Sequence, residues 1–379
     1  MEQTLNKSCK SYQLFHDAIN RPTTLKTYSK GIDHFMRFHK LTDYDFVAKQ
    51  DADTIQDWLE SWVISQKRDG LKHTTIVGRL NGVELFLDMN KRVWYRKIVR
   101  KLLPHNDEPI GGDVPFTTEE VYRMRLACKK PRDFAILDFL ASTGIRPKGV
   151  EDPILRIKHL VDMPHPKHVH SMPNWCYAIK IYDESKEGYW AFLHPEARAS
   201  MDRYLESRRR NGEKLASESP IFTTYENEPY TEHNYMSVYS IRRTLERLLK
   251  AADIERTKVG QRYDKAIVYG FRKRFNGILK MNNNVNSNIA EKLMSHKNGL
   301  DGNYLKPTRD ECYREFVKAI FELTTDPAER QKIKIKKLEE ERSENEIQKI
   351  ELENIKKDNK RIIAKLERLE ISMDSKNPN

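Results

Sequence analysis

Tyr304 is the residue in this sequence best placed to act as an oxygen nucleophile. It lies in the stretch IAEKLMSHKNGLDGNYLKPT, where an apolar helical turn ends near His296 and a glycine-containing turn separates that histidine from the tyrosine. A phenol attacks only after it loses its proton, and with a pKa of about 10 roughly a thousandth of it is ionised at pH 7. The chemistry therefore requires cations and an acid/base group elsewhere in the chain.

The same half of the chain supplies such groups. Arg146 follows an apolar helical segment in the motif STGIRP, and Lys186 lies at the tip of a predicted hairpin with the loop DESKEG. Tyr269 and Arg272 open a predicted helix, and His296 precedes the nucleophile. In chain order these candidate residues are Arg146, Lys186, Tyr269, Arg272, His296 and Tyr304.

This order and these local contexts resemble the tyrosine recombinase (phage integrase) family. The segments GLDGNYLKPTRDE and SKEGYWAFLHPEA are similar to those of archaeal-type integrases, which occur in archaea and their viruses and plasmids. A Thr-Gly-x-Arg motif alone is weakly specific, whereas all the motifs in order within one domain are strongly specific. The resemblance covers residues from about 20 to 325 and leaves out the C-terminal segment.

The resemblance implies a reaction that needs these residue types. Attack by Tyr304 on a DNA phosphodiester adds negative charge to the non-bridging oxygens, and Arg146 and Arg272 would bind that charge. Lys186 would protonate the leaving 5′-oxygen, and His296 would carry a proton or bind phosphate. The 3′-phosphotyrosyl bond stores the energy for resealing, so no cofactor and no metal are expected.

Some positions leave alternatives open. Lys180 competes with Lys186 as the general acid, and Tyr313 competes with Tyr304, although Tyr313 falls within an apolar periodicity that is typical of a core residue. Tyr269 stands where the family often has histidine, and a phenol cannot be a cation. Gly149 stands where many members have an acidic residue.

Hydrophobic periodicity predicts the elements that must position these groups. Residues 1–104 form an N-terminal all-α bundle, with helices expected at 23–40, 53–66, 74–89 and 94–103. Their N-caps are assigned to Thr23 or Thr24, Asp51 or Asp53, and Thr74 or Thr75. Residues 105–113 read as a linker and residues 114–326 as a catalytic domain, mainly α with a small β-sheet made by strands at 177–182 and 189–193. The resemblance implies that the N-terminal bundle is the core-binding, DNA-contacting domain.

A long charged helix is predicted at residues 327–373, followed by a disordered tail at 374–379. Heptads fit one register, and the second half of the segment reads as a coiled coil whereas a single solvated helix remains the alternative. The a positions are Leu338, Asn345, Leu352, Asn359, Leu366 and Met373, and the d positions are Glu341, Gln348, Ile355, Ile362 and Leu369.

Composition favours a polyanionic partner. The 379 residues are 33% charged and carry a net charge of +12, with a pI of about 9.3. No apolar run of membrane-spanning length and no signal-peptide pattern occurs, so we expect a cytoplasmic, nucleoid-associated protein without a membrane partner. The four scattered cysteines are typical of ordinary thiols. The basic residues of the N-terminal bundle are either solvated surface or phosphate contacts.

The combined expectation is a site-specific DNA recombinase that integrates and excises a mobile element, acting on double-stranded DNA as a homo-oligomer, a tetramer on two sites. Two other classes remain open: a DNA-binding protein that has lost catalysis, and a type IB topoisomerase that relaxes supercoils with similar residues. A chromosome dimer resolvase is a third, weaker alternative.

Overall fold

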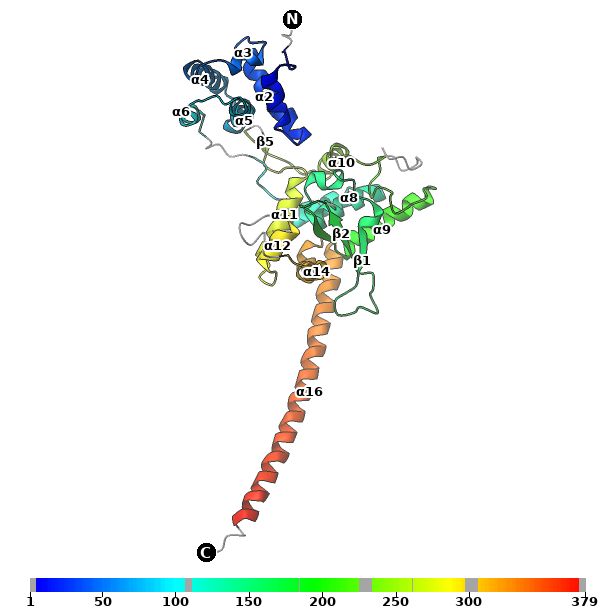
Figure 1. The fold of residues 1–379 in the computed structure, drawn as a ribbon. Coiled ribbons are helices and arrows are strands. Elements are labelled where there is room, and N and C mark those ends of the chain that lie inside the picture. Colours follow the sequence, from blue (N-terminus) through cyan, green and yellow to red (C-terminus); the bar gives the residue numbers. More distant parts are fainter. Residues whose placement is uncertain are drawn as a thin grey trace. The chain divides into compact units, whose positions relative to one another are not determined.

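The computed structural model describes residues 5–105, 111–183, 185–224, 234–260, 262–296 and 306–374, with side chains omitted at 344, 361 and 363–374. Contacts divide the chain into two units, Met1–Pro109 and Ile110–Asn379. Figure 1 shows the helices of the first unit in blue and cyan and those of the second in green to red. The predicted fold class, mainly helical with a small antiparallel sheet, is confirmed.

Helices make up the first unit within its described residues. They are α1 (Lys10–Asp17), α2 (Pro22–Phe38), α3 (Tyr44–Ala48), α4 (Ala52–Arg68), α5 (His73–Met89) and α6 (Arg96–Lys101). Their apolar faces enclose one core, in which Trp62 and Phe86 are fully buried. Helices α2 and α5 cross closely, because a Cβ atom on Gly31 would collide with the Arg79 backbone and one on Gly82 with the Tyr28 backbone.

The predicted helices of this unit are present, but two of the predicted caps are wrong. Asp51 caps α4 as expected, with its carboxylate 2.8 Å from the Thr54 amide. Helix α2 instead begins at Pro22, ahead of Thr23, because proline is already suited to the first helical position. Helix α5 begins at His73 and has Lys72 at its N-cap. Helix α1 is not among the predicted helices.

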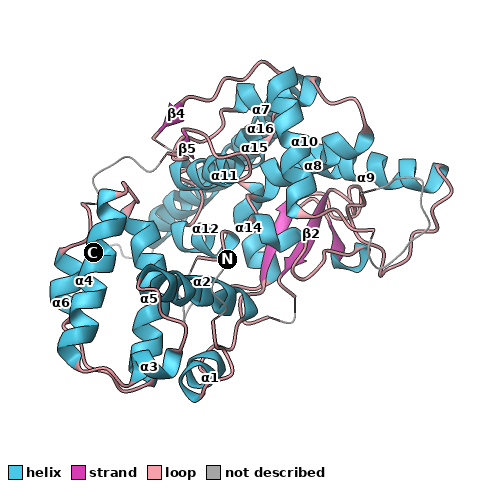
Figure 2. Cartoon of the chain, turned by 90° about the horizontal axis from the view of Figure 1, so that it is seen from above, coloured by secondary structure: helices cyan, strands magenta, loops and turns pink. Residues whose placement is uncertain are grey.

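The second unit wraps helices around a three-stranded sheet. Its helices are α7 (Thr118–Leu126), α8 (Pro131–Thr143), α9 (Pro195–Arg210), α10 (Val238–Ala251), α11 (Tyr269–Met281), α12 (Ser287–Leu293), α14 (Arg309–Val317), α15 (Ile320–Leu323) and α16 (Pro327–Asp374). Strands β1 (Leu160–Met163), β2 (Cys176–Ile181) and β3 (Tyr189–Leu193) are antiparallel with β2 in the centre (Figure 2). A small ribbon pairs β4 (Lys258–Val259) with β5 (Arg262–Tyr263).

The sheet separates two apolar cores. Ile179 and Ile181 face the core built on α8, whereas Ala178 and Phe192 face the one built on α12 and α14. The hairpin of β2 and β3 confirms the two predicted strands, and the short strand β1 was not predicted. Thr308 and Glu311 form the predicted capping box at the start of α14.

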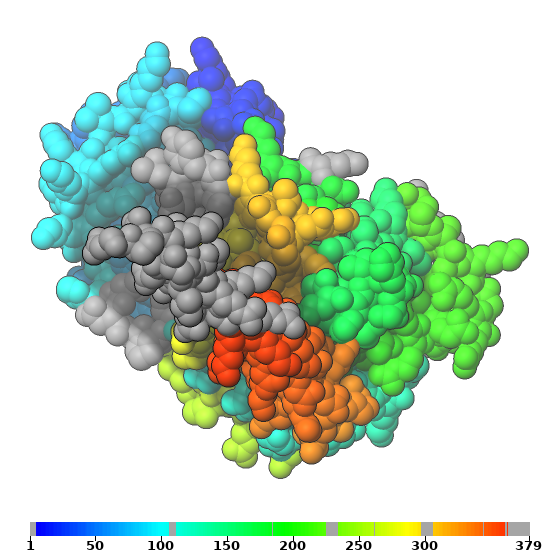
Figure 3. Space-filling model, turned by 90° about the horizontal axis from the view of Figure 1, so that it is seen from below, coloured from blue at the N-terminus to red at the C-terminus, as the bar shows by residue number. Residues whose placement is uncertain are grey.

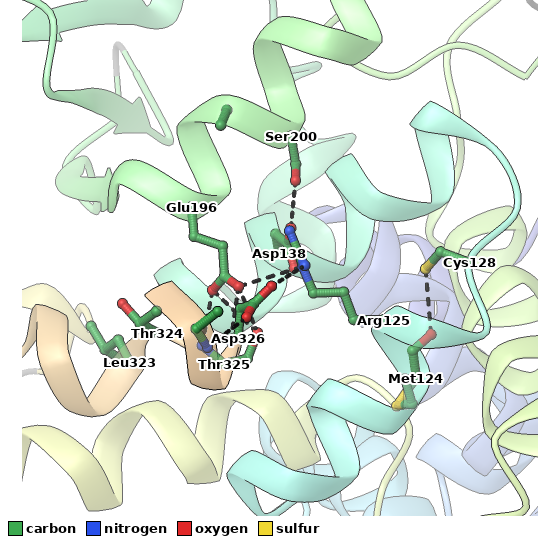
Figure 4. A network of polar contacts seen from close by, with 12 residues as sticks. Met124, Arg125, Cys128, Asp138, Glu196, Ser200, Leu323, Thr324, Thr325 and Asp326 are labelled. Atoms are coloured by element: carbon green, nitrogen blue, oxygen red, sulfur yellow. Dashed lines mark hydrogen bonds and ion pairs between the residues drawn. The ribbon is translucent and has the colours of Figure 1, made fainter. Parts of the chain in front are cut away.

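A buried polar network fixes the point where α16 begins (Figure 4). Arg125 of α7 lies 3.2 Å from Asp138, 3.5 Å from Glu196 and 3.3 Å from Asp326. Glu196 also accepts hydrogen bonds from the backbone amides of Thr325, at 2.9 Å, and Asp326, at 3.0 Å. Burial raises the pKa of Asp138 to about 7, although Arg125 opposes this shift. The network therefore joins α7, α8 and α9 to the base of the long helix.

Candidate DNA-cleavage site

Arg272 is the centre of the candidate site. It lies in the first turn of α11 and is only 5% exposed. Its Nη1 donates to the Gly144 carbonyl oxygen at 2.9 Å, and its Nη2 donates to the Met294 carbonyl oxygen and lies 3.0 Å from His296 Nε2. Burial lowers the pKa of this guanidinium, and the charge of Arg146 lowers it further, whereas Tyr189 opposes the shift. A single side chain thus joins the end of α8 to the turn after α12.

Arg146 reaches the same turn from the other side. Gly144 ends α8 with a positive φ of 54°, and a Cβ atom there would lie 2.7 Å from the Phe275 side chain. This position therefore requires glycine, because the backbone conformation and the close packing both exclude a side chain. Arg146 follows two residues later, is half-buried, and donates from Nη2 to the Ser295 carbonyl oxygen at 3.2 Å.

His296 is held in place by a charged partner on each ring nitrogen. Its Nδ1 lies 2.6 Å from Glu291 Oε2, and its Nε2 faces Arg272. Because a guanidinium only donates, Nε2 accepts and Nδ1 carries the proton that is donated to Glu291. Burial raises the pKa of Glu291, but hydrogen bonds from Lys280 and His296 outweigh it and leave this pKa below its usual value.

Three tyrosines surround the two arginines. Tyr189 is buried beside Arg272, and burial raises its pKa to about 12 against the opposing charges of Arg272 and Arg146. Tyr182 lies near the same two cations, and burial likewise raises its pKa. Tyr269, at the first position of α11, remains 48% exposed. The exposed phenol is therefore the one of the three that an incoming substrate can reach most readily.

The two candidate lysines differ in their surroundings. Lys180 lies in β2 opposite Trp190 of β3, with its Nζ 4.8 Å from the indole ring centroid. Lys186 lies in the turn between the two strands, and its side chain is exposed. A cation above an aromatic ring is already stabilised, whereas the turn lysine is free to follow a substrate. This contrast favours Lys186 over Lys180 as the general acid.

Tyr304 lies outside the described residues, so its position relative to the arginines stays a prediction. Its rival Tyr313 is 4% exposed, donates its hydroxyl to the Pro164 carbonyl oxygen at 2.8 Å, and packs on Phe192 with ring centroids 5.4 Å apart. Burial raises the pKa of Tyr313 well above its ordinary value. A buried and strongly protonated phenol is a poor nucleophile, as expected of a core residue.

Arg146, Arg272 and His296 are thus brought together, with Tyr269 beside them, and Lys186 lies on the adjoining hairpin. Sequence reasoning missed Glu291, Lys280, Tyr182 and Tyr189. Glu291 precedes His296 by five residues, which was a usable signal because a helix followed by a tight turn can return a side chain to its own last turn. The two tyrosines flank the hairpin loop and gave no such signal.

A second cationic surface lies on the first unit. Helices α2 and α5 line a hollow of about 930 Å³ whose basic residues are Lys26, Lys30, Arg37 and Arg79. Trp62 Nε1 donates to His34 Nδ1 at 3.0 Å, so the proton of this imidazole is on Nε2, 3.0 Å from Arg79 Nη1. His34 thus connects Trp62 of α4 to Arg79 of α5 beside the hollow.

Nothing in the described residues resembles a built metal centre. The one grouping of potential ligands there is Cys9, Asp43 and Asp45. Its carboxylates already accept hydrogen bonds, Asp43 from the Asp45 amide at 3.0 Å and Asp45 from the Ser11 hydroxyl at 2.5 Å.

Within the described part of the chain, none of the helices is long and apolar enough to span a bilayer.

Comparison with known proteins gives the fold. No protein-family model and no curated protein matches the sequence. Among solved structures, XerH site-specific recombinase in a post-cleavage complex with palindromic difH substrate aligns with a TM-score of 0.51 at 15% identity, covering 77% of this chain and 80% of that one.

Two further structures align at lower scores. The Tn1549 transposon integrase bound to transposon right end DNA has a TM-score of 0.47 at 17% identity, covering 82% of this chain and 99% of that one. A lambda integrase dimer bound to a core site has a TM-score of 0.46 at 11% identity, covering 78% and 94%. Since identity with XerH is low, the likeness concerns architecture: the chain shares the fold of a tyrosine site-specific recombinase.

Proposed function

We propose that this protein is a site-specific DNA recombinase that cleaves and rejoins DNA through a 3′-phosphotyrosine intermediate formed on Tyr304. The observation that carries the proposal is the convergence of Arg146, Arg272 and His296 on one turn, Met294–His296, which leads directly into the segment that holds Tyr304. The recombinase fold supports the same conclusion independently of these side chains.

In the proposed reaction, the scissile phosphate binds to guanidinium N–H groups of Arg146 and Arg272 beside the turn Met294–His296. Their combined charge stabilises the phosphorane-like transition state. His296, held by Glu291, accepts or returns the tyrosyl proton, and Tyr269 donates a hydrogen bond to a phosphate oxygen. Lys186 protonates the leaving 5′-oxygen from its exposed turn. The lack of a histidine at position 269 leaves His296 as the main acid/base group near the nucleophile.

We further propose that the substrate is double-stranded DNA at a defined site and that the active assembly is a tetramer. The reaction would integrate and excise a mobile genetic element of archaeal, viral or plasmid type. The basic hollow of α2 and α5 supports a DNA-contacting role for the first unit, because its cations line one concave surface. These proposals are tested by strand exchange between two candidate sites. Relaxation of supercoiled DNA without sequence preference would instead favour a topoisomerase.

A further inference from the structure

Helix α16 consists of a base that contacts its unit and a shaft, residues 341–374, whose described side chains are exposed. Arg330 lies 4.8 Å from the Phe321 ring centroid, Lys336 Nζ lies 3.6 Å from Met172 Sδ, and Glu340 pairs with Lys167 at 3.6 Å and with His168 at 3.5 Å. Every contact described between α16 and the remainder of its unit lies at or before Glu340. The backbone nevertheless stays helical to Asp374 (Figure 1), and Figure 3, which views the molecule from below, shows residues of α16 in orange and red.

The shaft carries a line of exposed apolar side chains. Leu352, Ile355 and Ile362 are 53%, 58% and 53% exposed. They occupy a, d and d of one heptad register, and the sequence repeats the pattern at Leu366 and Leu369. Nearer the base the same register holds Glu341, Asn345 and Gln348, which disfavour pairing. At the a and d positions the apolar line therefore begins at Leu352, and polar residues occupy the a and d positions between it and the anchored base.

We propose that residues 352–374 pair with the same segment of a second copy of this chain in a parallel, in-register coiled coil. Parallel pairing places Asn359 opposite Asn359, where two amides satisfy each other, and stacks Ile355 and Ile362 each on its own copy. An antiparallel pair that opposes Leu352 to Ile362 sets Asn359 against Ile355, and leaves that amide buried without a polar partner.

Charged residues beside the line of apolar side chains also favour the parallel orientation. Glu351 occupies a g position and Lys356 the next e position, which are the two positions that face each other across a parallel dimer. Two-fold symmetry makes this attractive pair occur twice. The sequence therefore favours a second copy over an unrelated partner, because both sides of the interface are already encoded in one chain.

Parallel pairing would bring two catalytic units together. The meaning of this for recombination rests on the proposed function, whereas the pairing itself does not. The base of α16 is fixed to its catalytic unit by the network of Arg125 and Glu196, so two paired shafts hold two catalytic units at the same end. An antiparallel pair that opposes Leu352 to Ile362 is centred on residue 357 and would separate the two helix starts at Pro327 by about 90 Å, given a rise of about 1.5 Å per residue. The first arrangement brings two catalytic units close together, which suits the proposed recombination between two sites.

Disulfide trapping in the full-length chain tests the proposal. Ile355→Cys places a thiol in the seam, and Lys357→Cys, at an f position, is the matched control on the outer face. The four native cysteines are buried and do not compete. We expect a disulfide-linked dimer from Ile355→Cys in mild oxidant and monomer from Lys357→Cys. Equal dimer yields from both variants, or none from either, would overturn the proposal.

Two further measurements fix orientation and partner. A mixture of Leu352→Cys and Ile362→Cys chains that cross-links to each other more than each does to itself would show antiparallel pairing and refute the parallel arrangement. Glu351→Lys should lower dimer affinity by about tenfold, since two attractive pairs become repulsive, and adding Lys356→Glu should restore it. Sedimentation without DNA reads out this pair of variants. A disulfide-linked dimer of a protein that does not cleave DNA would refute the proposed recombinase function and support the coiled coil. DNA cleavage by a protein that forms no disulfide-linked dimer would refute the coiled coil and support the recombinase function.

Discussion

Replacing Arg272 with alanine should cost stability as well as catalysis, whereas replacing Arg146 should cost mainly catalysis. The sequence places Arg146 just after a glycine turn and Arg272 at a helix start, positions that give no reason to expect either side chain to be buried. The structure corrects this for Arg272, which is 5% exposed and bonds the carbonyls of Gly144 and Met294. Arg146 is half-buried and makes one such bond, to Ser295.

The magnitudes follow from these contacts. Removing a buried charged donor leaves its acceptors unpaired, so Arg272→Ala should lower the free energy of unfolding by about 3–5 kcal/mol. Arg146→Ala loses one partly solvated bond, and about 1 kcal/mol is expected. Since 1 kcal/mol shifts the Tm of a domain of this size by about 2–4 °C, the two variants should differ by at least about 4 °C. Both should reduce cleavage by at least about a hundredfold.

The assay is thermal unfolding of wild type, Arg272→Ala, Arg272→Lys and Arg146→Ala, beside cleavage of a nicked duplex. Arg272→Lys is the informative control, because it keeps the charge but cannot bond two carbonyls in the fork geometry of a guanidinium. It should recover part of the Tm and little of the cleavage. Equal Tm values for both alanine variants would refute the buried-clamp interpretation of Arg272, and near-normal cleavage by either would refute the phosphate-binding role.

Other expected outcomes follow from the same structure. Tyr304→Phe should abolish the covalent protein–DNA adduct and leave DNA affinity nearly unchanged in gel shifts, whereas Tyr313→Phe should keep the adduct and lose about 1 kcal/mol of stability; an adduct from Tyr304→Phe would move the nucleophile elsewhere. DNA affinity should fall by roughly a thousand- to a hundred-thousandfold between about 50 and 200 mM salt, and Lys30→Ala should make this dependence on salt less steep. A salt titration in which the affinity of the wild type stays constant would contradict the expectation. Because the folded pKa of Glu291 is depressed, its contribution to stability is present above its unfolded pKa and is lost as the pH falls through the folded value, so acid titration of stability should be shallower in Glu291→Gln than in wild type. Deleting residues 341–379 should leave single-site cleavage and Tm unchanged. Deleting residues 328–379 should lower Tm, because Arg330 and Ile333 pack on the catalytic unit.

Much of the fold was predictable from hydrophobic periodicity. The faces built on Ile32, Leu59 and Leu80 are buried as expected, and the capping box of Thr308 and Glu311 set the start of α14. Strand β1 was missed because LVDM is too short to show an alternating pattern, and α1 because its burial comes from packing on α3 and α5.

The candidate site was predictable in its residue types but not in its internal contacts. Arginine is a surface residue by default, so nothing local showed that Arg272 would be buried by backbone carbonyls from two distant turns. Glu291 acts on His296 only because Ser295 adopts a positive φ of 52° and reverses the chain. The Arg272 contacts depend on tertiary geometry, which periodicity and motif spacing do not encode, whereas the Glu291–His296 contact is local and its five-residue spacing could have indicated it.

Isolation of the covalent protein–DNA intermediate tests most directly whether Tyr304 is the nucleophile. Full-length protein is incubated with a nicked duplex of a candidate site, separated by denaturing electrophoresis, and the adduct is digested and mapped to a peptide. We expect a DNA-linked peptide that contains Tyr304, joined through a 3′-phosphate, and no adduct from Tyr304→Phe. An adduct on another residue, or strand exchange without any covalent intermediate, would contradict it.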